Sequence, residues 1–203
     1  MVTIVDYGMG NLGSVLNMFK YLKIEAEITG DHKRIADAGK VLLPGVGAFD
    51  AAMSRINESG LREVLDKKAL EDKVPILGIC LGMQLLTNSS EEGRIPGLGW
   101  IPAKTNKFVF ADNKLKVPHI GWNRVQRTTP SPLTEGFDEE FRFYFVHSYY
   151  VLCDDERNAI LTTQYGLPFH SAIQRDNIYG TQFHPEKSHK YGMQLLRNFA
   201  AIK

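Results

Sequence analysis

The sequence predicts an α/β fold: a mostly parallel central sheet flanked by helices, with an antiparallel or mixed extension in the second half of the chain. In the first half, continuous apolar strand-like runs alternate with segments of helical spacing, which is typical of a parallel sheet covered on both faces. In the second half, strand-like segments follow one another and are separated by turn residues. A length of 203 residues suits one well-filled core, so we expect a single domain over residues 1–203.

The expected strands of the first half end at turns that contain glycine or proline. They lie at residues 2–7, 25–29, 40–44 and 74–79. Helices are expected after Asn11, which can cap an apolar stripe of helical spacing, and around residues 51–56, around residues 61–70 and from Leu81. Strands of the second half are expected within residues 98–110, 115–125, 140–152, 159–165 and 171–183, before a final helix over residues 191–202.

Composition and charge exclude several classes of function. The net charge is +1, so no strong field recruits nucleic acid or an anionic membrane. The N-terminal residues lack the pattern of a signal peptide, and the longest mostly apolar run, residues 74–86, is too short to cross a bilayer. We therefore expect a cytoplasmic protein with two reduced cysteines. The Cys-x-x-Cys and Cys/His spacings of a zinc site are absent, and we expect no metal and no cofactor.

A glycine loop near the N-terminus raises one alternative. Residues 6–14 read DYGMGNLGS, in which Gly8, Gly10 and Gly13 have the spacing of a dinucleotide-binding fingerprint. A strand-like segment precedes the loop, a helical one follows, and Glu27 lies about 20 residues on, where that fingerprint has an acidic residue. The motif by itself fits a nucleotide cradle or a plain strand-to-helix turn.

The segment that carries chemistry is PILGICLGMQLL. Gly78 and Gly82 bracket Cys80 in the pattern G-x-C-x-G, the thiol version of a nucleophile elbow between a strand and a helix. The turn is too tight for side chains beside the nucleophile, and it sets the sulfur at a helix N-terminus, which favours the thiolate. Cys153 has no such setting, and we interpret it as structural.

A thiol nucleophile needs a base and a group that orients the base. In GTQFHPEKS, His184 follows an apolar strand, and Glu186 can point to the same side and bond one imidazole nitrogen. His119 and His147 lie in aromatic, strand-like segments without a carboxylate two residues on, so we interpret them as structural or partner-contact residues.

An acyl transfer also needs donors for the developing oxyanion. The loop PGVG at the end of the third expected strand has backbone N–H groups around Val46 and Gly47 that could act with the N–H of Leu81. A plain turn is the alternative for this loop.

Together, PGVG, GICLGMQ and HPE resemble the triad (class I) glutamine amidotransferases, and the resemblance spans essentially the whole chain in the expected order. The narrower resemblance is to the glutaminase subunits of imidazole glycerol phosphate synthases, on DYGMGNLGS, PGVGAF, GICLGMQLL, HIGWN, YFVHSYY and QFHPEKS. The glycine loop then looks like the first strand-to-helix turn of this family rather than a cofactor cradle.

The resemblance implies a role for each matching residue. Cys80 would be the nucleophile, His184 the acid–base group and Glu186 its orienting partner. The oxyanion site would be framed by Gly45, Val46, Gly47 and Leu81. L-Glutamine would contact Gln84, His147, Ser148 and Tyr149, and the partner subunit would contact Asn11, Tyr144 and Lys187.

The resemblance also implies the reaction: hydrolysis of L-glutamine to glutamate and ammonia, which passes to a (β/α)₈-barrel cyclase subunit in a heterodimer. The cyclase would make imidazole glycerol phosphate and AICAR in histidine biosynthesis, and its nucleotide would activate the glutaminase. Three alternatives remain. They are a glutaminase subunit of another amidotransferase (anthranilate, aminodeoxychorismate or pyridoxal-phosphate type), a stand-alone cysteine hydrolase, and a non-catalytic scaffold.

Overall fold

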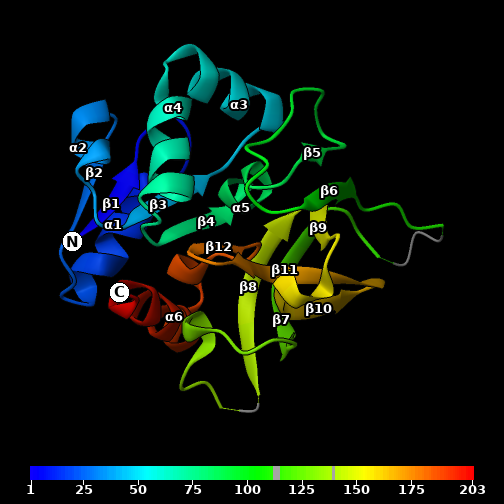
Figure 1. Cartoon of the computed structure of the whole chain (residues 1–203). Helices are drawn as coiled ribbons and strands as arrows, with labels where there is room; N and C mark the ends of the chain where they lie inside the picture. Colours follow the sequence, from blue (N-terminus) through cyan, green and yellow to red (C-terminus); the bar gives the residue numbers. More distant parts are fainter. Residues whose placement is uncertain (112–114, 139) are drawn as a thin grey trace.

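The computed structural model describes residues 1–111, 115–138 and 140–203, and in these residues twelve strands form one sheet (Figure 1). One half of the sheet is parallel and has the order β2-β1-β3-β4-β12. These strands are β1 (Val2–Val5), β2 (Ala26–Thr29), β3 (Val41–Gly45), β4 (Ile76–Cys80) and β12 (Ile178–Thr181). The predicted parallel core is therefore confirmed.

The sheet continues mostly in antiparallel pairs, as predicted for the second half of the chain; the exception is the short pair of β5 with β6, which is parallel. The order from β12 is β11-β10-β7-β8, and β9 branches from β11 to pair with β6, which in turn pairs with β5. These strands are β5 (Ser89–Ser90), β6 (Ala103–Lys107), β7 (His119–Arg127), β8 (Phe141–His147), β9 (Tyr149–Cys153), β10 (Ala159–Tyr165) and β11 (Leu167–Arg175).

Helices cover both faces of the parallel strands, which is why these strands are continuously apolar. On one face, Val5, Leu43 and Ile76 pack into a cluster with α2 (His32–Ala36), α3 (Phe49–Glu58), α4 (Leu61–Asp66) and α5 (Leu81–Leu85). On the other face, Ile4 and Leu42 pack with α1 (Leu12–Tyr21) and α6 (His189–Ala201). Short helical turns complete the chain: η1 (Lys67–Glu71), η2 (Pro132–Thr134), η3 (Glu156–Asn158) and η4 (Pro185–Lys187).

Some element boundaries differ from the expectation. The segment 140–152 is two strands, β8 and β9, separated at Ser148, and 171–183 is divided between β11 and β12. The second break is a tight turn at Asp176, whose φ is +52°, a value that Asp tolerates better than most residues. The short helix α2 and the two-residue strand β5 were not predicted, because neither is long enough to show a period.

The topology brings three strand ends to one edge. Strands β3, β4 and β12 are neighbours and parallel, so their carboxyl ends meet on the same side of the sheet. Within the described residues, no helix is long and apolar enough to cross a membrane.

Candidate active site

Cys80 is the last residue of β4, and helix α5 begins directly after it. Its φ is +55°, a conformation that is strained for a residue with a side chain and is typical of functional turns. A Cβ on Gly82 would lie 1.8 Å from the carbonyl oxygen of Leu43, and one on Gly78 would lie 2.5 Å from that of Gly82. The prediction that both glycines are required by a tight strand-to-helix turn is confirmed.

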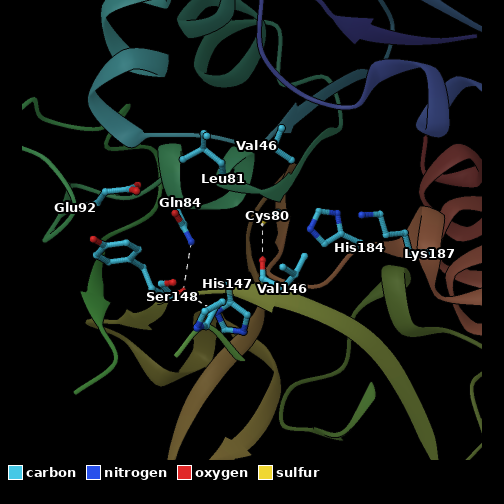
Figure 2. A pocket seen from close by; sticks show the side chains of 13 residues that line it. Val46, Cys80, Leu81, Gln84, Glu92, Val146, His147, Ser148, His184 and Lys187 are labelled. Atoms are coloured by element: carbon cyan, nitrogen blue, oxygen red, sulfur yellow. Dashed lines mark hydrogen bonds between the residues drawn. The ribbon is translucent and has the colours of Figure 1, made fainter. Parts of the chain in front are cut away.

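Cys80 lines a pocket of about 320 Å³ (Figure 2). The residue is 8% exposed. Nε2 of Gln182 donates to Sγ at 3.8 Å, and the carbonyl oxygen of Val146 is 4.0 Å from Sγ. The turn therefore presents the thiol to a cavity and gives it a polar donor.

His184 lines the same pocket, and Glu186 lies behind it. Nδ1 of His184 is 2.8 Å from Oε1 of Glu186, and both side chains are 3% exposed. The backbone of His184 is held from two sides: its N–H donates to the carbonyl of Tyr144, and its carbonyl accepts from Oγ of Ser188. The other ring nitrogen, Nε2, is buried and has no hydrogen-bond partner among the described residues, so it is not engaged by another protein group.

The environment of His184 favours its charged form. Burial is the largest influence on its pKa and acts to lower it, but the interactions with Cys80 and Glu186 together outweigh burial and raise the pKa to about 10. The surroundings of the ring thus favour the imidazolium over the neutral imidazole. The imidazolium can give a proton to a departing group and stabilise negative charge near it.

Most of the residues predicted to bind substrate or stabilise an oxyanion line the pocket. They are Val46, Gly47, Leu81, Gln84, His147, Ser148 and Tyr149. Gly45 lies just behind them: a Cβ there would be 2.9 Å from the N of Gly82 and 2.7 Å from the hydroxyl of Tyr7. The loop PGVG and the start of α5 are thus packed against each other beside Cys80, which is the placement that the oxyanion prediction requires.

Glu92 also lines the pocket, and sequence reasoning missed it. Its Oε2 accepts the N–H of Phe49 at 3.0 Å, and burial raises the pKa of the carboxyl, partly countered by that hydrogen bond. Figure 2 shows Glu92 and His184 at opposite ends of the pocket, with Gln84 and Cys80 between them. Glu92 lies in a loop after β5, next to Glu91, and belongs to no motif that could have identified it. Gln182, which lies inside the recognised QFHPEKS motif, was likewise given no role.

The N-terminal glycine loop supports the end of β3. The hydroxyl of Tyr7 donates to the carbonyl of Pro44 at 2.7 Å, and a Cβ on Gly10 would lie 3.4 Å from the same oxygen. In a dinucleotide fingerprint the third glycine allows close helix–strand packing. A Cβ on Gly13 would meet no described atom within 4 Å, which argues against that fingerprint. The predicted cap is confirmed: Oδ1 of Asn11 accepts the N–H of Ser14.

The three residues expected at a partner interface lie around the site. Lys187 is exposed and lines the pocket. Tyr144 is half-buried, with its ring 6.2 Å from that of Trp122. Asn11 borders a small cavity with His184 and Glu186, behind the pocket.

The remaining predicted structural residues are buried. Both cysteines are free; burial raises the pKa of Cys153 to about 12, and its N–H donates to His170. His119 and His147 are buried, and His147 also contacts the pocket. In the part of the chain that the structure describes, no group of three or more His, Cys, Asp or Glu side chains could hold a metal ion.

Known proteins resemble this chain along its whole length. A family model described as glutamine amidotransferase class-I matches residues 3–202. The imidazole glycerol phosphate synthase subunit HisH 2 of Methanococcus maripaludis is 55% identical over 199 residues, which is 98% of each chain. Subunit HisH of Bdellovibrio bacteriovorus and subunit HisH 2 of Pseudomonas aeruginosa are each 47% identical over 100% of both chains.

Solved structures share the fold at much lower identity. A glutamine amidotransferase crystal structure superposes with a TM-score of 0.74 at 18% identity, with 100% of both chains covered. PurLQS from Thermotoga maritima superposes with a TM-score of 0.75 at 17% identity, covering 98% of this chain and 96% of that one.

Proposed function

Since the chain belongs to the class-I glutamine amidotransferase family, we propose that it is the glutaminase subunit of an imidazole glycerol phosphate synthase in histidine biosynthesis. It hydrolyses L-glutamine to glutamate and ammonia and supplies the ammonia to a cyclase subunit. One observation supports the chemistry above all: the strained Cys80 and His184, whose ring is held by the buried Glu186, line one pocket.

The first half of the reaction forms a thioester. The sulfur of Cys80 attacks the carboxamide carbon of glutamine, and the charge on the carbonyl oxygen is met by backbone N–H groups of the Val46–Gly47 loop and of Leu81. The imidazolium of His184 protonates the amide nitrogen as the C–N bond breaks, and ammonia leaves. Glu186 keeps the ring oriented and, together with Cys80, favours its positive charge until that step.

The second half returns the enzyme to its starting state. A water molecule takes the place of ammonia, and neutral His184 removes one of its protons as oxygen attacks the thioester carbon. The C–S bond breaks, glutamate is released, and Cys80 and His184 recover their initial charges. The sum is one glutamine and one water consumed, and one glutamate and one ammonia formed.

The polar ends of the pocket suit free glutamine. Its α-ammonium group needs an acceptor away from the reacting amide, and Glu92 lines the end of the pocket opposite His184. Gln84, Ser148 and Tyr149 also line the pocket and provide further hydrogen-bonding groups.

An exposed face beside the pocket suits a partner subunit. Trp122 and Ile120 on β7 are 42% and 59% exposed, and they lie opposite Tyr144 and Val146 of β8 in the strand register. Val146 also lines the pocket. A barrel-type cyclase bound to this apolar face would also cover the opening of the pocket. Ammonia could then pass between the subunits without becoming ammonium in bulk water.

Replacing Cys80→Ala tests the proposal. Reconstituted with the cyclase subunit, the variant should lose glutamine-dependent synthesis of imidazole glycerol phosphate, because no thioester can form. Synthesis from added ammonium salt at alkaline pH should remain at the wild-type level, which serves as the control for assembly and folding. Glutamate release that persists in the variant would remove Cys80 from the mechanism.

A further inference from the structure

Two buried histidines on neighbouring strands are hydrogen-bonded to each other beside the pocket. His119 on β7 lies opposite His147 on β8, and its Nδ1 is 2.9 Å from Nε2 of His147. The ring of His119 is stacked between Phe145 and Tyr165, with centroid separations of 4.8 and 3.9 Å. The reaction described above uses neither imidazole, yet His147 lines the pocket.

The contact between His147 and Tyr149 determines which ring nitrogen of each histidine carries the hydrogen. Nδ1 of His147 is 2.7 Å from the carbonyl oxygen of Tyr149, and this oxygen can only accept, so Nδ1 is the donor. Burial lowers the pKa of His147 to about 3 and that of His119 to about 4, so each ring is neutral and carries one hydrogen. Nε2 of His147 is therefore an acceptor, and Nδ1 of His119 donates to it.

The other end of the pair leads to the same assignment. Oδ1 of Asn123 accepts the N–H of Arg124 at 2.8 Å, which turns Nδ2 toward the carbonyl of Gln164 and toward Nε2 of His119, 3.3 Å away. Nε2 of His119 is thus an acceptor and its Nδ1 a donor. Both rings are Nδ1–H tautomers, and the hydrogen bonds run in one direction, from Asn123 to Tyr149.

The hydrogen bonds continue from Tyr149 to the nucleophile. Nε2 of Gln84 donates to the carbonyl of Tyr149 at 3.4 Å and to Oε1 of Gln182 at 3.1 Å. Nε2 of Gln182 then donates to Sγ of Cys80 at 3.8 Å. Because both hydrogens of the Gln84 amide are engaged, its oxygen is left for the substrate; Figure 2 shows the nitrogen directed at the strand and the oxygen on the other side.

We propose that His119 is a positioning residue for the glutaminase reaction: through His147 it holds the carbonyl of Tyr149 in place as an acceptor and so keeps the amide oxygen of Gln84 available to glutamine. The use of that oxygen by glutamine rests on the proposed function. The tautomers rest on contacts within the protein alone.

Loss of the His119 donor leaves His147 two arrangements, and both are unfavourable. In the first, Nδ1 keeps its hydrogen and a buried Nε2 is left without a donor, which costs free energy. In the second, the hydrogen moves to Nε2, and the lone pair of Nδ1 then faces the carbonyl of Tyr149. Either arrangement loosens the segment from His147 to Tyr149 that forms one wall of the pocket.

Nitrogen NMR of the full chain labelled at histidine tests the tautomers directly, because protonated and bare ring nitrogens have well-separated ¹⁵N shifts. We expect neutral Nδ1–H rings for both His119 and His147 at neutral pH; the His119 signals are those that vanish in His119→Phe, and the His147 signals are those that vanish in His147→Phe. An Nε2–H or a charged form at either ring would overturn the proposal, whatever the activity of the enzyme.

Two substitutions separate hydrogen bonding from packing. His119→Phe keeps the stacked ring and removes both nitrogens, whereas His119→Asn removes the ring and offers an NH₂ group near the position of Nδ1. In the complex with the cyclase, we expect His119→Phe to raise the KM for glutamine about five-fold or more, with a smaller change in kcat, because a buried acceptor is left unpaired. His119→Asn should stay closer to wild type.

A packing role would give the opposite order, since only Phe preserves the stacking. The opposite order, or equal losses in both variants, would therefore overturn the proposal. A wild-type complex without glutaminase activity would instead refute the proposed function, and the NMR result would still decide the tautomers.

Discussion

The charge of a single imidazole decides whether ammonia can leave, and Cys80 and Glu186 together favour that charge. Glu186→Gln keeps an oxygen as acceptor for Nδ1 of His184 but removes the negative charge, so the pKa of His184 falls from about 10. The proton is then lost at lower pH. We expect the alkaline limb of kcat/KM for glutamine, measured in the complex, to move down by at least about one pH unit, the usual effect of a nearby opposite charge.

A matched variant is provided by the second histidine–carboxylate pair. Oε2 of Glu156 is 3.2 Å from Nε2 of His170, and neither residue lines the pocket, so Glu156→Gln removes the same charge from a different imidazole. Its pH profile should coincide with that of wild type. An alkaline limb that stays in place in Glu186→Gln would show that Glu186 does not set the charge of His184.

At the residue scale, local patterns reveal some of the site and conceal the rest. Cys80 and the His184–Glu186 pair could be predicted because their neighbours in sequence are also their neighbours in space. Glu92 and Gln182 reach the site only through tertiary structure: Glu92 is held by the N–H of Phe49, and Gln182 by Gln84. No spacing in the sequence records such contacts.

At the scale of the element, the strand-to-helix turn at Cys80 depends on the absence of a side chain at Gly82. A Cβ there would lie 1.8 Å from the backbone of β3, and a backbone atom cannot move aside as a flexible side chain can. We expect Gly82→Ala to lower the free energy of unfolding by about 1–3 kcal/mol, the usual cost of overpacking. For a chain of this size, thermal denaturation should show a fall of about 2–4 °C in Tm per kcal/mol.

Gly13→Ala is the matched control for that change. A Cβ on Gly13 meets no described atom within 4 Å, and this residue lies in helix α1. Alanine should leave stability unchanged or raise it by about 0.4–1 kcal/mol through the unfolded state. A Tm for Gly82→Ala equal to that of Gly13→Ala would contradict the close approach of α5 to β3.

Helices and strands could be predicted where the segment shows a clear apolar run or an apolar stripe of helical spacing. The apolar runs of β1, β3 and β4 and the stripe of α1 are such cases. The pairing of β9 with both β6 and β11 could not be predicted, because antiparallel partners depend on tertiary contacts rather than on the segments themselves. The sequence consequently indicated an antiparallel or mixed extension without its strand order.

At the scale of the whole molecule, the site exists because distant segments end at one sheet edge. The loop after β3, the nucleophile at the end of β4 and His184 beyond β12 come from positions spread over most of the chain, and parallel pairing sets them side by side. The antiparallel half supplies the opposite wall through the segment from His147 to Tyr149. The same half exposes Trp122, so one unit of structure serves both the pocket and the proposed docking face.

That shared wall leads to a prediction about assembly. Trp122 on β7 lies opposite Tyr144 on β8, and the carbonyl of Tyr144 accepts the backbone N–H of His184. A partner bound at Trp122 would therefore contact the strand pair that holds the backbone of His184. We expect Trp122→Ala to weaken binding of the cyclase subunit about ten-fold or more in a titration, since buried tryptophans are frequent hot spots at interfaces. Tyr21→Ala removes a 73% exposed aromatic ring from the end of α1 and should leave the Kd unchanged. Equal affinities for the two variants would place the docking face elsewhere on the molecule.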